Sequence, residues 1–383
     1  MLLYGDNLDA VPTQTSIGGK VNATHVPADT ERWMRPLTTF KTSGDRGCAV
    51  GVFEASRCPI PIGSEKALVF FGSEPGKAAS ICTVSVTTEN PTQAHFIGGM
   101  FSWKPRSPDI DYPRPIIGWN GGLEVPENTS GLDPLEVWAA TALMLVDQHL
   151  WVAGQSGNTQ IAVETEYHLE MELNPATHRV TIWLNGHKEL EDVYVESLDR
   201  VDTLGWMLGS VRTSPNTLAD CYIVVDDIFV LDGTGDSFNA RLGPVRFKRV
   251  PLLAQDDITW TPDGAAGNLE AVNKTTLSDA TYNVSPAAND KADTFTVDTS
   301  GLDPDATILG VMMNTYAAKA DVGDRSLDQV VITNGQTARN PFGHHLSSTY
   351  NGADPYVLAK APDDSAWDID TIDNTVFGYE VKE

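Results

Sequence analysis

In this 383-residue sequence, the residues whose types and spacing first suggest chemistry are acidic. Asp226 and Asp227 are adjacent in the apolar stretch YIVVDDIFVL, and Asp232 and Asp236 follow in a glycine-rich loop. Two neighbouring acids inside an apolar strand are costly unless one faces water and the other is paired. Hard cations such as Ca²⁺ prefer several oxygen donors, so the Asp226-Asp227 pair is a candidate ion ligand, and the loop with Asp232 and Asp236 could also chelate Ca²⁺. The alternative is that one acid pairs with an arginine or caps a backbone group.

A stripe of glutamates gives a second candidate, the carboxylate pair of a glycosidase. Its members are Glu164, Glu166, Glu170 and Glu172. A retaining glycosidase needs two carboxylates about 5–5.5 Å apart, and one strand can supply them. However, Glu170 and Glu172 alternate with apolar residues that must face a core, so we expect both on the solvent face. The sequence also lacks a Glu-x-Asp-x-x-Glu run, so we expect no enzyme.

Three aromatic residues could form a contact surface. Trp103, Tyr112 and Trp119 lie in or beside the proline-rich segment KPRSPDIDYPRPIIGWNGG, which we expect to be a long loop over a sheet edge. Aromatic rings with a polar tip suit exposed binding faces. These three residues either pack over the edge or contact a glycan or a neighbouring subunit.

Cysteines and histidines give no metal or redox motif. Cys48, Cys58, Cys82 and Cys221 are irregularly spaced, with no CxxC pair, so we expect reduced thiols, although a Cys48–Cys58 bridge could form in an oxidising compartment. His344-His345 lacks a third ligand at metal spacing. No cofactor other than Ca²⁺ at the four aspartates is therefore expected.

The charge of the chain narrows the class of partner. There are 52 acidic and 26 basic residues, a net charge of −26. This negative charge argues against binding to nucleic acids or to anionic membranes. It favours solubility, and repulsion between like charges would keep closely packed copies of the chain apart. The N-terminal residues have no basic secretory region. The most apolar stretch, Val137–Gly154, is interrupted at Asp147, so we expect no membrane span.

The sequence pattern favours short β-strands. The 32 Gly and 23 Pro residues are spread along the whole chain and favour short elements. No segment has apolar residues at the spacing of an amphipathic helix. Tyr167–Leu173 alternates apolar and polar residues, and Val180–Leu184 ends at Asn185-Gly186, a type I′ turn signal. Val137–Gly154 is interpreted as a hairpin that turns at Asp147-Gln148. Consecutive antiparallel strands of this kind predict a β-sandwich.

The segment Asp232–Pro251 resembles a hinge in composition. The segment begins rich in glycine and ends rich in basic residues. The sequence that follows it is rich in Asp, Asn, Thr and Ala. We therefore predict a sandwich at residues 1–240, a linker at 241–253 and a second β-rich domain at 254–383.

Several fragments resemble known families. YHLEMELNPATHRVTIWLNGHKE resembles the central strands of laminin-G or concanavalin-A-like jelly rolls. VVDDIFVLDGTGDSFNARLGPVRF resembles the last sandwich strand and exit segment of many tailed-phage virion proteins, which continue into Leu-Gly-Asp-x-Arg-Val. Here Pro244 takes the usual Asp position and Arg246 comes one residue late. Three later fragments are similar to the region that follows in the same proteins: Asp279–Val284, Thr307–Gly323 and Asp364–Val381.

The resemblance implies an all-β protein, a concanavalin-A-like jelly roll followed by a smaller β-rich domain for docking or oligomerisation. It also implies a non-enzymatic structural protein of a phage particle, on the tail or the capsid exterior. We expect a homo-oligomer, most readily a trimer, that is assembled in the bacterial cytoplasm and contacts other virion proteins. A glycan-binding adhesin that recognises host polysaccharide, or a polysaccharide-degrading glycosidase, are the alternatives.

Overall fold

The structure is a computed structural model in which two compact units follow one another along the chain. In the described residues the division falls between Phe247 and Lys248, inside the segment predicted as a linker. The described residues are 1–6, 39–43, 49–55, 58, 60, 66–71, 79–105, 113–123, 134–211, 221–274, 280–286, 291–319, 326–341, 346, 348, 351–352 and 356–382.

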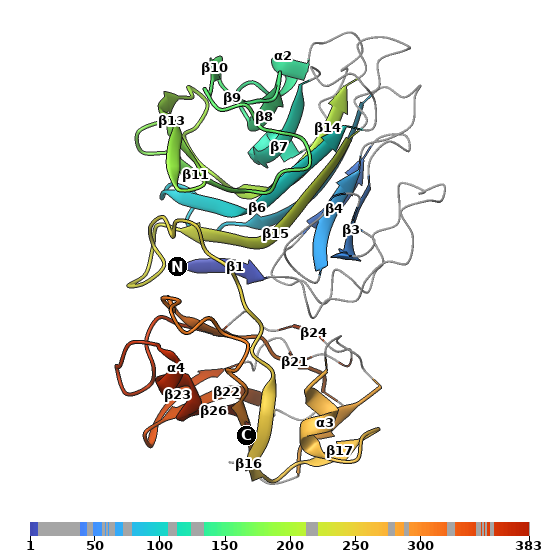
Figure 1. Ribbon diagram of the computed structural model, residues 1–383, viewed down its shortest axis with the longest axis vertical. Coiled ribbons are helices and arrows are strands. Elements are labelled where there is room, and N and C mark those ends of the chain that lie inside the picture. The colour runs from blue at the N-terminus through green and yellow to red at the C-terminus, as the bar shows by residue number, and fades with distance from the viewer. Residues whose placement is uncertain are drawn as a thin grey trace. The chain divides into compact units, whose positions relative to one another are not determined.

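The first unit contains two antiparallel sheets (Figure 1). Sheet A has the order β13-β12-β11-β6-β15-β4-β3, with β1 also paired to β15. Its strands are β1 (Leu2–Asp6), β3 (Ala49–Glu54), β4 (Lys66–Phe71), β6 (His95–Pro105), β11 (Tyr167–Asn174), β12 (Arg179–Leu184), β13 (His187–Tyr194) and β15 (Cys221–Asp232).

Sheet B has the order β10-β9-β8-β7-β14-β5-β2. Its strands are β2 (Thr39–Ser43), β5 (Ala79–Thr87), β7 (Arg114–Trp119), β8 (Ala142–Val146), β9 (His149–Val152), β10 (Gln155–Ser156) and β14 (Thr203–Val211). A short 3₁₀ helix η2 (Asn120–Leu123) and helix α2 (Pro134–Trp138) accompany this sheet.

The two sheets pack face to face around an apolar interior. Phe101 of β6 stacks on Trp206 of β14 with ring centroids 6.3 Å apart, and both rings are buried. The alternation predicted for β11 is confirmed, because Leu169, Met171 and Leu173 are fully buried. The predicted fold is therefore correct: the first unit is a concanavalin-A-like β-sandwich of the jelly-roll type, and a smaller β-rich domain follows it.

Tight turns join neighbouring strands at the predicted positions. Asn185 and Gly186 have φ of 49° and 83°, so the β12–β13 turn is left-handed at both residues, as type I′ requires. Asp147 and Gln148 have φ of 48° and 62°, so the predicted turn between β8 and β9 is of the same kind. The beginning of the predicted hairpin segment is helical instead, because α2 extends to Trp138.

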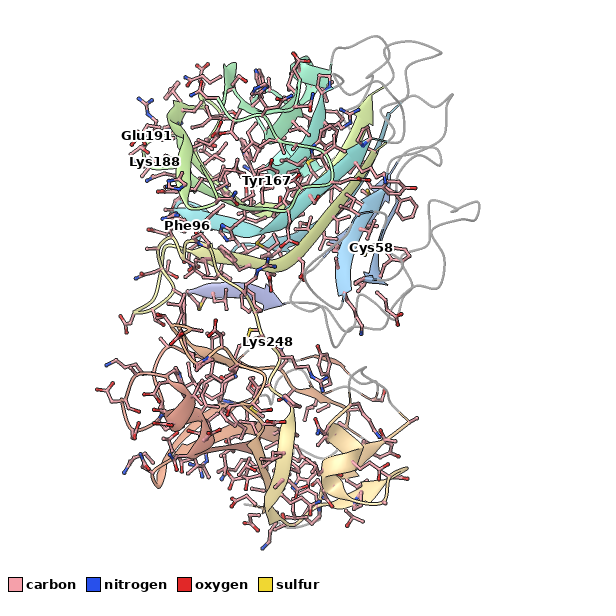
Figure 2. The ribbon with its side chains drawn as sticks, viewed as in Figure 1. Cys58, Phe96, Tyr167, Lys188, Glu191 and Lys248 are labelled. Carbon is pink, nitrogen blue, oxygen red and sulfur yellow. The ribbon has the colours of Figure 1, made fainter. Side chains whose placement is uncertain are left out.

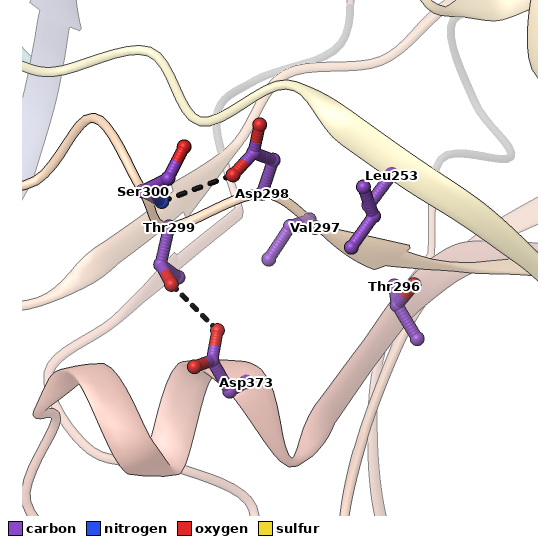
Figure 3. A pocket seen from close by; sticks show the side chains of 7 residues that line it. All are labelled: Leu253, Thr296, Val297, Asp298, Thr299, Ser300 and Asp373. Atoms are coloured by element: carbon purple, nitrogen blue, oxygen red, sulfur yellow. Dashed lines mark hydrogen bonds between the residues drawn. The ribbon is translucent and has the colours of Figure 1, made fainter.

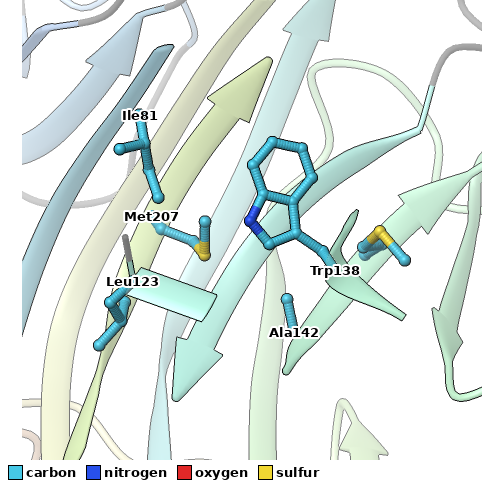
Figure 4. Packing of buried hydrophobic residues seen from close by; sticks show 6 residues of the cluster. Ile81, Leu123, Trp138, Ala142 and Met207 are labelled. Carbon is cyan, nitrogen blue, oxygen red and sulfur yellow. The ribbon is translucent and has the colours of Figure 1, made fainter. Parts of the chain in front are cut away.

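A second apolar cluster covers the outer side of sheet B (Figure 4). The Trp138 ring from α2 packs against Met207 of β14, Ile81 of β5 and Ala142 of β8. Gly209 leaves room for this ring, since a Cβ there would lie 2.8 Å from Trp138. Sheet B is thus buried on both faces, which explains why the sequence around Val137–Gly154 is apolar on both sides.

The central strand β15 contains a bulge at the acidic pair. Asp226 is opposite Met100 and Phe229 is opposite Gly98, so Asp227 and Ile228 together stand opposite Gly99. Asp227 has φ of 49°, which is typical of a bulged residue. The bulge also lies where the neighbour of β15 changes from β4 to β1.

The second unit is built on the five-stranded antiparallel sheet C, in the order β16-β19-β26-β22-β23. Its strands are β16 (Leu252–Ile258), β19 (Lys291–Val297), β22 (Ser326–Thr333), β23 (Gln336–Pro341) and β26 (Thr375–Lys382). Smaller pairs are β17 (Thr261–Asp263) with β18 (Tyr282–Val284), β20 (Val311–Met313) with β25 (Tyr356–Leu358), and β21 (Tyr316–Ala317) with β24 (Asn351–Gly352). The helices are α3 (Asn268–Val272) and α4 (Ile369–Asp373).

The second unit has its own core and its own buried polar centre. Val331, Trp367, Ile372 and Phe377 form the centre of an apolar cluster. The fully buried Asp293 accepts backbone hydrogen bonds from Thr259 and Trp260 at 2.7 and 2.8 Å, which ties the end of β16 to β19. Among the described residues of the chain, none of the helices has the length and apolarity needed to span a bilayer.

Candidate functional site

The segment that follows β15 runs across the outer face of sheet A. We call residues 233–247 the strap. Phe96, Phe229 and Leu231 point outward from the sheet, and side chains of the strap pack on them: Phe238, Leu242, Val245 and Phe247. Figure 2 shows Tyr167 on the inner side of sheet A and Phe96 on the opposite side. The strap thus gives sheet A a second buried face.

Glu170 of β11 is completely buried under the strap, which corrects its predicted solvent exposure. Its carboxylate accepts the backbone N–H groups of Leu242 and Gly243 at 2.9 and 3.2 Å. The Arg241 guanidinium forms an ion pair with the same carboxylate at 3.0 Å. Burial raises the pKa of Glu170, and these partners oppose that rise.

Asp227 fastens the end of the strap. Its two carboxylate oxygens accept the Phe247 backbone N–H at 2.9 Å and the Arg246 guanidinium at 2.8 Å. Arg246 also pairs with Glu166. Burial raises the pKa of Asp227, and the hydrogen bonds from Arg246 and Phe247 oppose the rise. The interpretation that one acid of the pair contacts an arginine or caps a backbone group is therefore confirmed, and Asp227 does both.

Glu170 and Asp227, with the strap groups that they hold, form what we call the carboxylate clasp. It joins two parts of the one fragment that resembles phage virion proteins, the Asp226-Asp227 strand and the segment Leu242–Arg246. His168 is buried beside the clasp and stacks on Phe229 with centroids 6.2 Å apart. Burial, Arg241 and Arg246 lower the pKa of His168 to about 4.

The four aspartates proposed as ion ligands have separate surroundings, which corrects both proposed ion sites. Asp227 belongs to the clasp, and Asp236 is exposed in the strap. Asp232 accepts hydrogen bonds from Thr234 Oγ1 at 2.6 Å and Asn90 at 3.0 Å. Asp226, 3% exposed, is close enough to Cys58 to reinforce the effect of burial, which raises the pKa of that thiol to about 12. Within the described ranges, no three His, Cys, Asp or Glu side chains gather as a metal site.

The predicted aromatic contact surface is also corrected. Trp103 is 0% exposed and Trp119 is 1% exposed, so neither ring can stack on a glycan or a neighbouring subunit. Trp103 donates its indole N–H to the Ile161 carbonyl at 3.2 Å, and the Arg114 guanidinium lies 5.5 Å from its ring centre. Both tryptophans are on strands, β6 and β7, rather than in the predicted loop. Tyr112 and the His344-His345 pair lie outside the described residues.

The glutamates proposed as glycosidase candidates have different surroundings. Glu164 pairs with Lys104, and Glu166 pairs with Arg246. Glu170 is inside the clasp, and Glu172 remains half-buried with a pKa raised mainly by burial. Three of the four carboxylates therefore serve ion pairs.

One exposed aromatic residue was not identified from the sequence. Tyr194 of β13 is 52% exposed. Alternation from the buried Leu190 predicts that Tyr194 faces inward, but Leu190 pairs with Ile182 and Val193 with Val180, so β13 has one extra residue between Leu190 and Val193. This bulge, where Asp192 has φ of 51°, turns Val193 inward and Tyr194 outward. Nothing in the local sequence distinguishes the two registers.

The second unit has a shallow pocket of about 450 Å³ between β16, the end of β19 and α4 (Figure 3). Asp298 accepts the Ser300 backbone N–H at 3.0 Å, and Asp373 accepts the Thr299 hydroxyl at 2.6 Å. The exposed Leu253 lies at its rim. Both carboxylates therefore hold the adjoining turn in place.

Comparisons with known proteins give structural similarities alone. No family model and no curated protein matches the sequence. A sialidase is similar over 49% of this chain at 13% identity with a TM-score of 0.32, and this chain spans 17% of that protein. The catalytic domain of a GH131 β-glucanase from Podospora anserina is similar over 61% of this chain and 97% of its own, at 12% identity and a TM-score of 0.35.

A seed lectin from Lotus tetragonolobus is similar over 50% of this chain and 97% of its own, at 10% identity and a TM-score of 0.32. The three proteins include enzymes and a lectin, so these similarities do not separate a catalytic from a binding function.

Proposed function

We propose that this chain is a non-enzymatic structural component of a tailed-phage particle and that it assembles there as a symmetric oligomer. The carboxylate clasp is the observation that supports this role. The strand and the exit segment of the fragment that resembles phage virion proteins contact each other through Asp227 and Arg246, so these residues hold the strap in place. The residues that resemble those of phage proteins pack and form hydrogen bonds within this chain. Such internal contacts suit a structural role.

The particle role can be tested on virions. Mass spectrometry of purified particles, released by a strain that encodes this chain, should detect the chain at a constant ratio to the other structural proteins. Its absence from particles that are otherwise complete would contradict the proposal.

The oligomer can be tested on the purified protein by light scattering, with and without EDTA. We expect a multiple of the 41.4 kDa chain mass, with a trimer as the first candidate. EDTA should leave the mass unchanged, because Asp227 and Asp232 already hold protein groups. A monomer with no affinity for other particle proteins would contradict the assembly role.

A glycan-binding adhesin is the second candidate function. The observation that favours it is the exposed ring of Tyr194, since amphipathic aromatic rings are suited to stacking on sugars. The two functions are compatible, because a particle protein can also contact the host surface. Hydrolysis of polysaccharide is not expected, and an assay for released reducing ends, with Glu172→Gln as a further variant, tests that expectation.

A further inference from the structure

The surface around Tyr194 is organised by cross-strand contacts at the edge of sheet A. Arg179 of β12 lies directly opposite Tyr194 of β13, and its guanidinium carbon lies over one face of the ring, 5.3 Å from the ring centre. The His178 ring lies 6.0 Å from the Tyr194 ring, tilted by 37°. We call these three residues the Tyr194 surface.

The two neighbours of the ring are themselves held by backbone carbonyls. Arg179 donates to the Asp192 carbonyl at 2.7 Å, and His178 Nδ1 donates to the Glu196 carbonyl at 3.2 Å. His178 and Asp192 both have left-handed backbone, with φ of 54° and 51°. Surface side chains that are fixed in this way lose little conformational entropy on binding, which favours recognition.

Polar atoms remain free around the ring. The Tyr194 hydroxyl has no hydrogen-bond partner among the described residues, and Arg179 uses only one of its donors there. Because His178 Nδ1 donates, its Nε2 is an acceptor in the neutral ring. A flat apolar ring surrounded by donors and acceptors matches the chemistry of a sugar, which has apolar C–H faces and a rim of hydroxyl groups.

Charge and exposure narrow the ligand class. Arg179 contributes one positive charge, while the neighbouring exposed Asp192 and Glu196 contribute two negative charges, so an acidic polymer would be repelled. A stable protein partner buries a broader surface, about 800 Å² on each side, around an apolar centre. Among the described sandwich residues, the other exposed large apolar side chains are Met1 and Val163. A neutral saccharide fits this surface better.

We infer that the Tyr194 surface is a binding site for a neutral saccharide, with the face of the Tyr194 ring that Arg179 does not cover as the stacking platform and Arg179 and His178 as hydrogen-bonding groups. This inference rests on the second candidate function and adds the site and the ligand class to it.

An array of neutral and acidic oligosaccharides, followed by calorimetric titration of the best neutral binder, tests the inference on the full chain. The Tyr194→Ala variant should lose about tenfold or more in affinity, whereas Tyr194→Phe should retain most of it because the ring is kept. Leu253→Ala is the matched control, since Leu253 is 58% exposed and belongs to the second unit. Its affinity should equal that of the wild type.

The outcomes separate the two claims. If the wild type binds no glycan, both the adhesin function and the inferred site are wrong. If the wild type binds a neutral glycan and Tyr194→Ala binds it equally well, the site alone is wrong. Binding confined to acidic glycans would overturn the ligand class. Unchanged thermal unfolding of Tyr194→Ala would show that any loss of binding is local.

Discussion

Glu170 and Glu172 lie two residues apart on the same face of β11, yet they have opposite environments. Glu170 is 0% exposed beneath the strap, and Glu172 is half-buried. Glu170 holds two backbone N–H groups and an arginine, which together compensate for the loss of water around its charge. Glu170 therefore holds the strap in place, whereas Glu172, two residues further along the same strand, is partly exposed to solvent.

Replacing Glu170 with Gln should destabilise the sandwich by about 2–3 kcal/mol. The amide can accept only through one oxygen, so one backbone N–H and Arg241 lose their partner. Urea unfolding of the purified variant measures the change. Glu172→Gln is the control and should alter stability by less than about 0.5 kcal/mol. Equal effects of the two substitutions would show that the clasp does not hold the strap.

His168 should make the stability of the sandwich depend on pH. Its pKa in the folded protein is about 4, below the ordinary 6.5, so between these values only the unfolded chain takes up the proton. The His168 contribution is fully present above pH 6.5 and is lost as the pH falls towards 4. Between about pH 7 and pH 5 the loss should be about 2 kcal/mol.

The measurement compares the wild type with His168→Leu by urea unfolding at both pH values. Glu170 and Asp227 have raised pKa values and change stability in the opposite direction, but they do so in both proteins. The difference between the two proteins therefore isolates His168. A difference that stays constant with pH would show that His168 takes up its proton equally in both states.

At the scale of the element, the bulge in β15 explains how an apolar central strand contains two adjacent acids. Asp227 and Ile228 share one position opposite Gly99, so Asp227 is redirected towards the strap. The glycine is required because a Cβ at residue 99 would lie 2.8 Å from the Asp226 carbonyl oxygen. The acidic pair and the glycine on the neighbouring strand thus form one structural feature.

Gly99→Ala should destabilise the sandwich by about 1–3 kcal/mol, because the new methyl group meets backbone atoms that cannot rotate away. Gly121→Ala is a matched control, since a Cβ there meets nothing within 4 Å. Thermal unfolding of both variants gives the comparison. If Gly99→Ala is as stable as Gly121→Ala, the bulge has more freedom than the described contacts allow.

Elements with local signals were predictable from the sequence, and those that depend on distant segments were not. The Asn185-Gly186 turn and the inner face of β11 follow from residue type and alternation. The burial of Glu170 depends on the strap, which lies about 70 residues further along the chain. The exposure of Tyr194 depends on a bulge that reverses the alternation, and Trp103 is buried because its segment is a strand of sheet A.

At the scale of the whole molecule, the two units have separate cores and should unfold separately. The sandwich core includes Phe101 and Trp206, and the core of the second unit includes Trp367 and Phe377. Differential scanning calorimetry of the full chain should resolve two transitions, since domains with their own cores usually unfold as units. Glu170→Gln should lower the temperature of only one of them. A single transition that shifts as a whole would contradict independent units.

The clasp also determines where a mechanical load enters the sandwich. The chain leaves the sandwich after Phe247, whose backbone N–H is bound by Asp227 of the central strand. Tension applied from residue 248 onward would therefore pass first through Asp227 into β15, which is paired with strands on both sides, before it reached the rest of the strap. Rupture would require breaking the Phe247 and Arg246 contacts together, so the clasp shields the rest of the strap from the load.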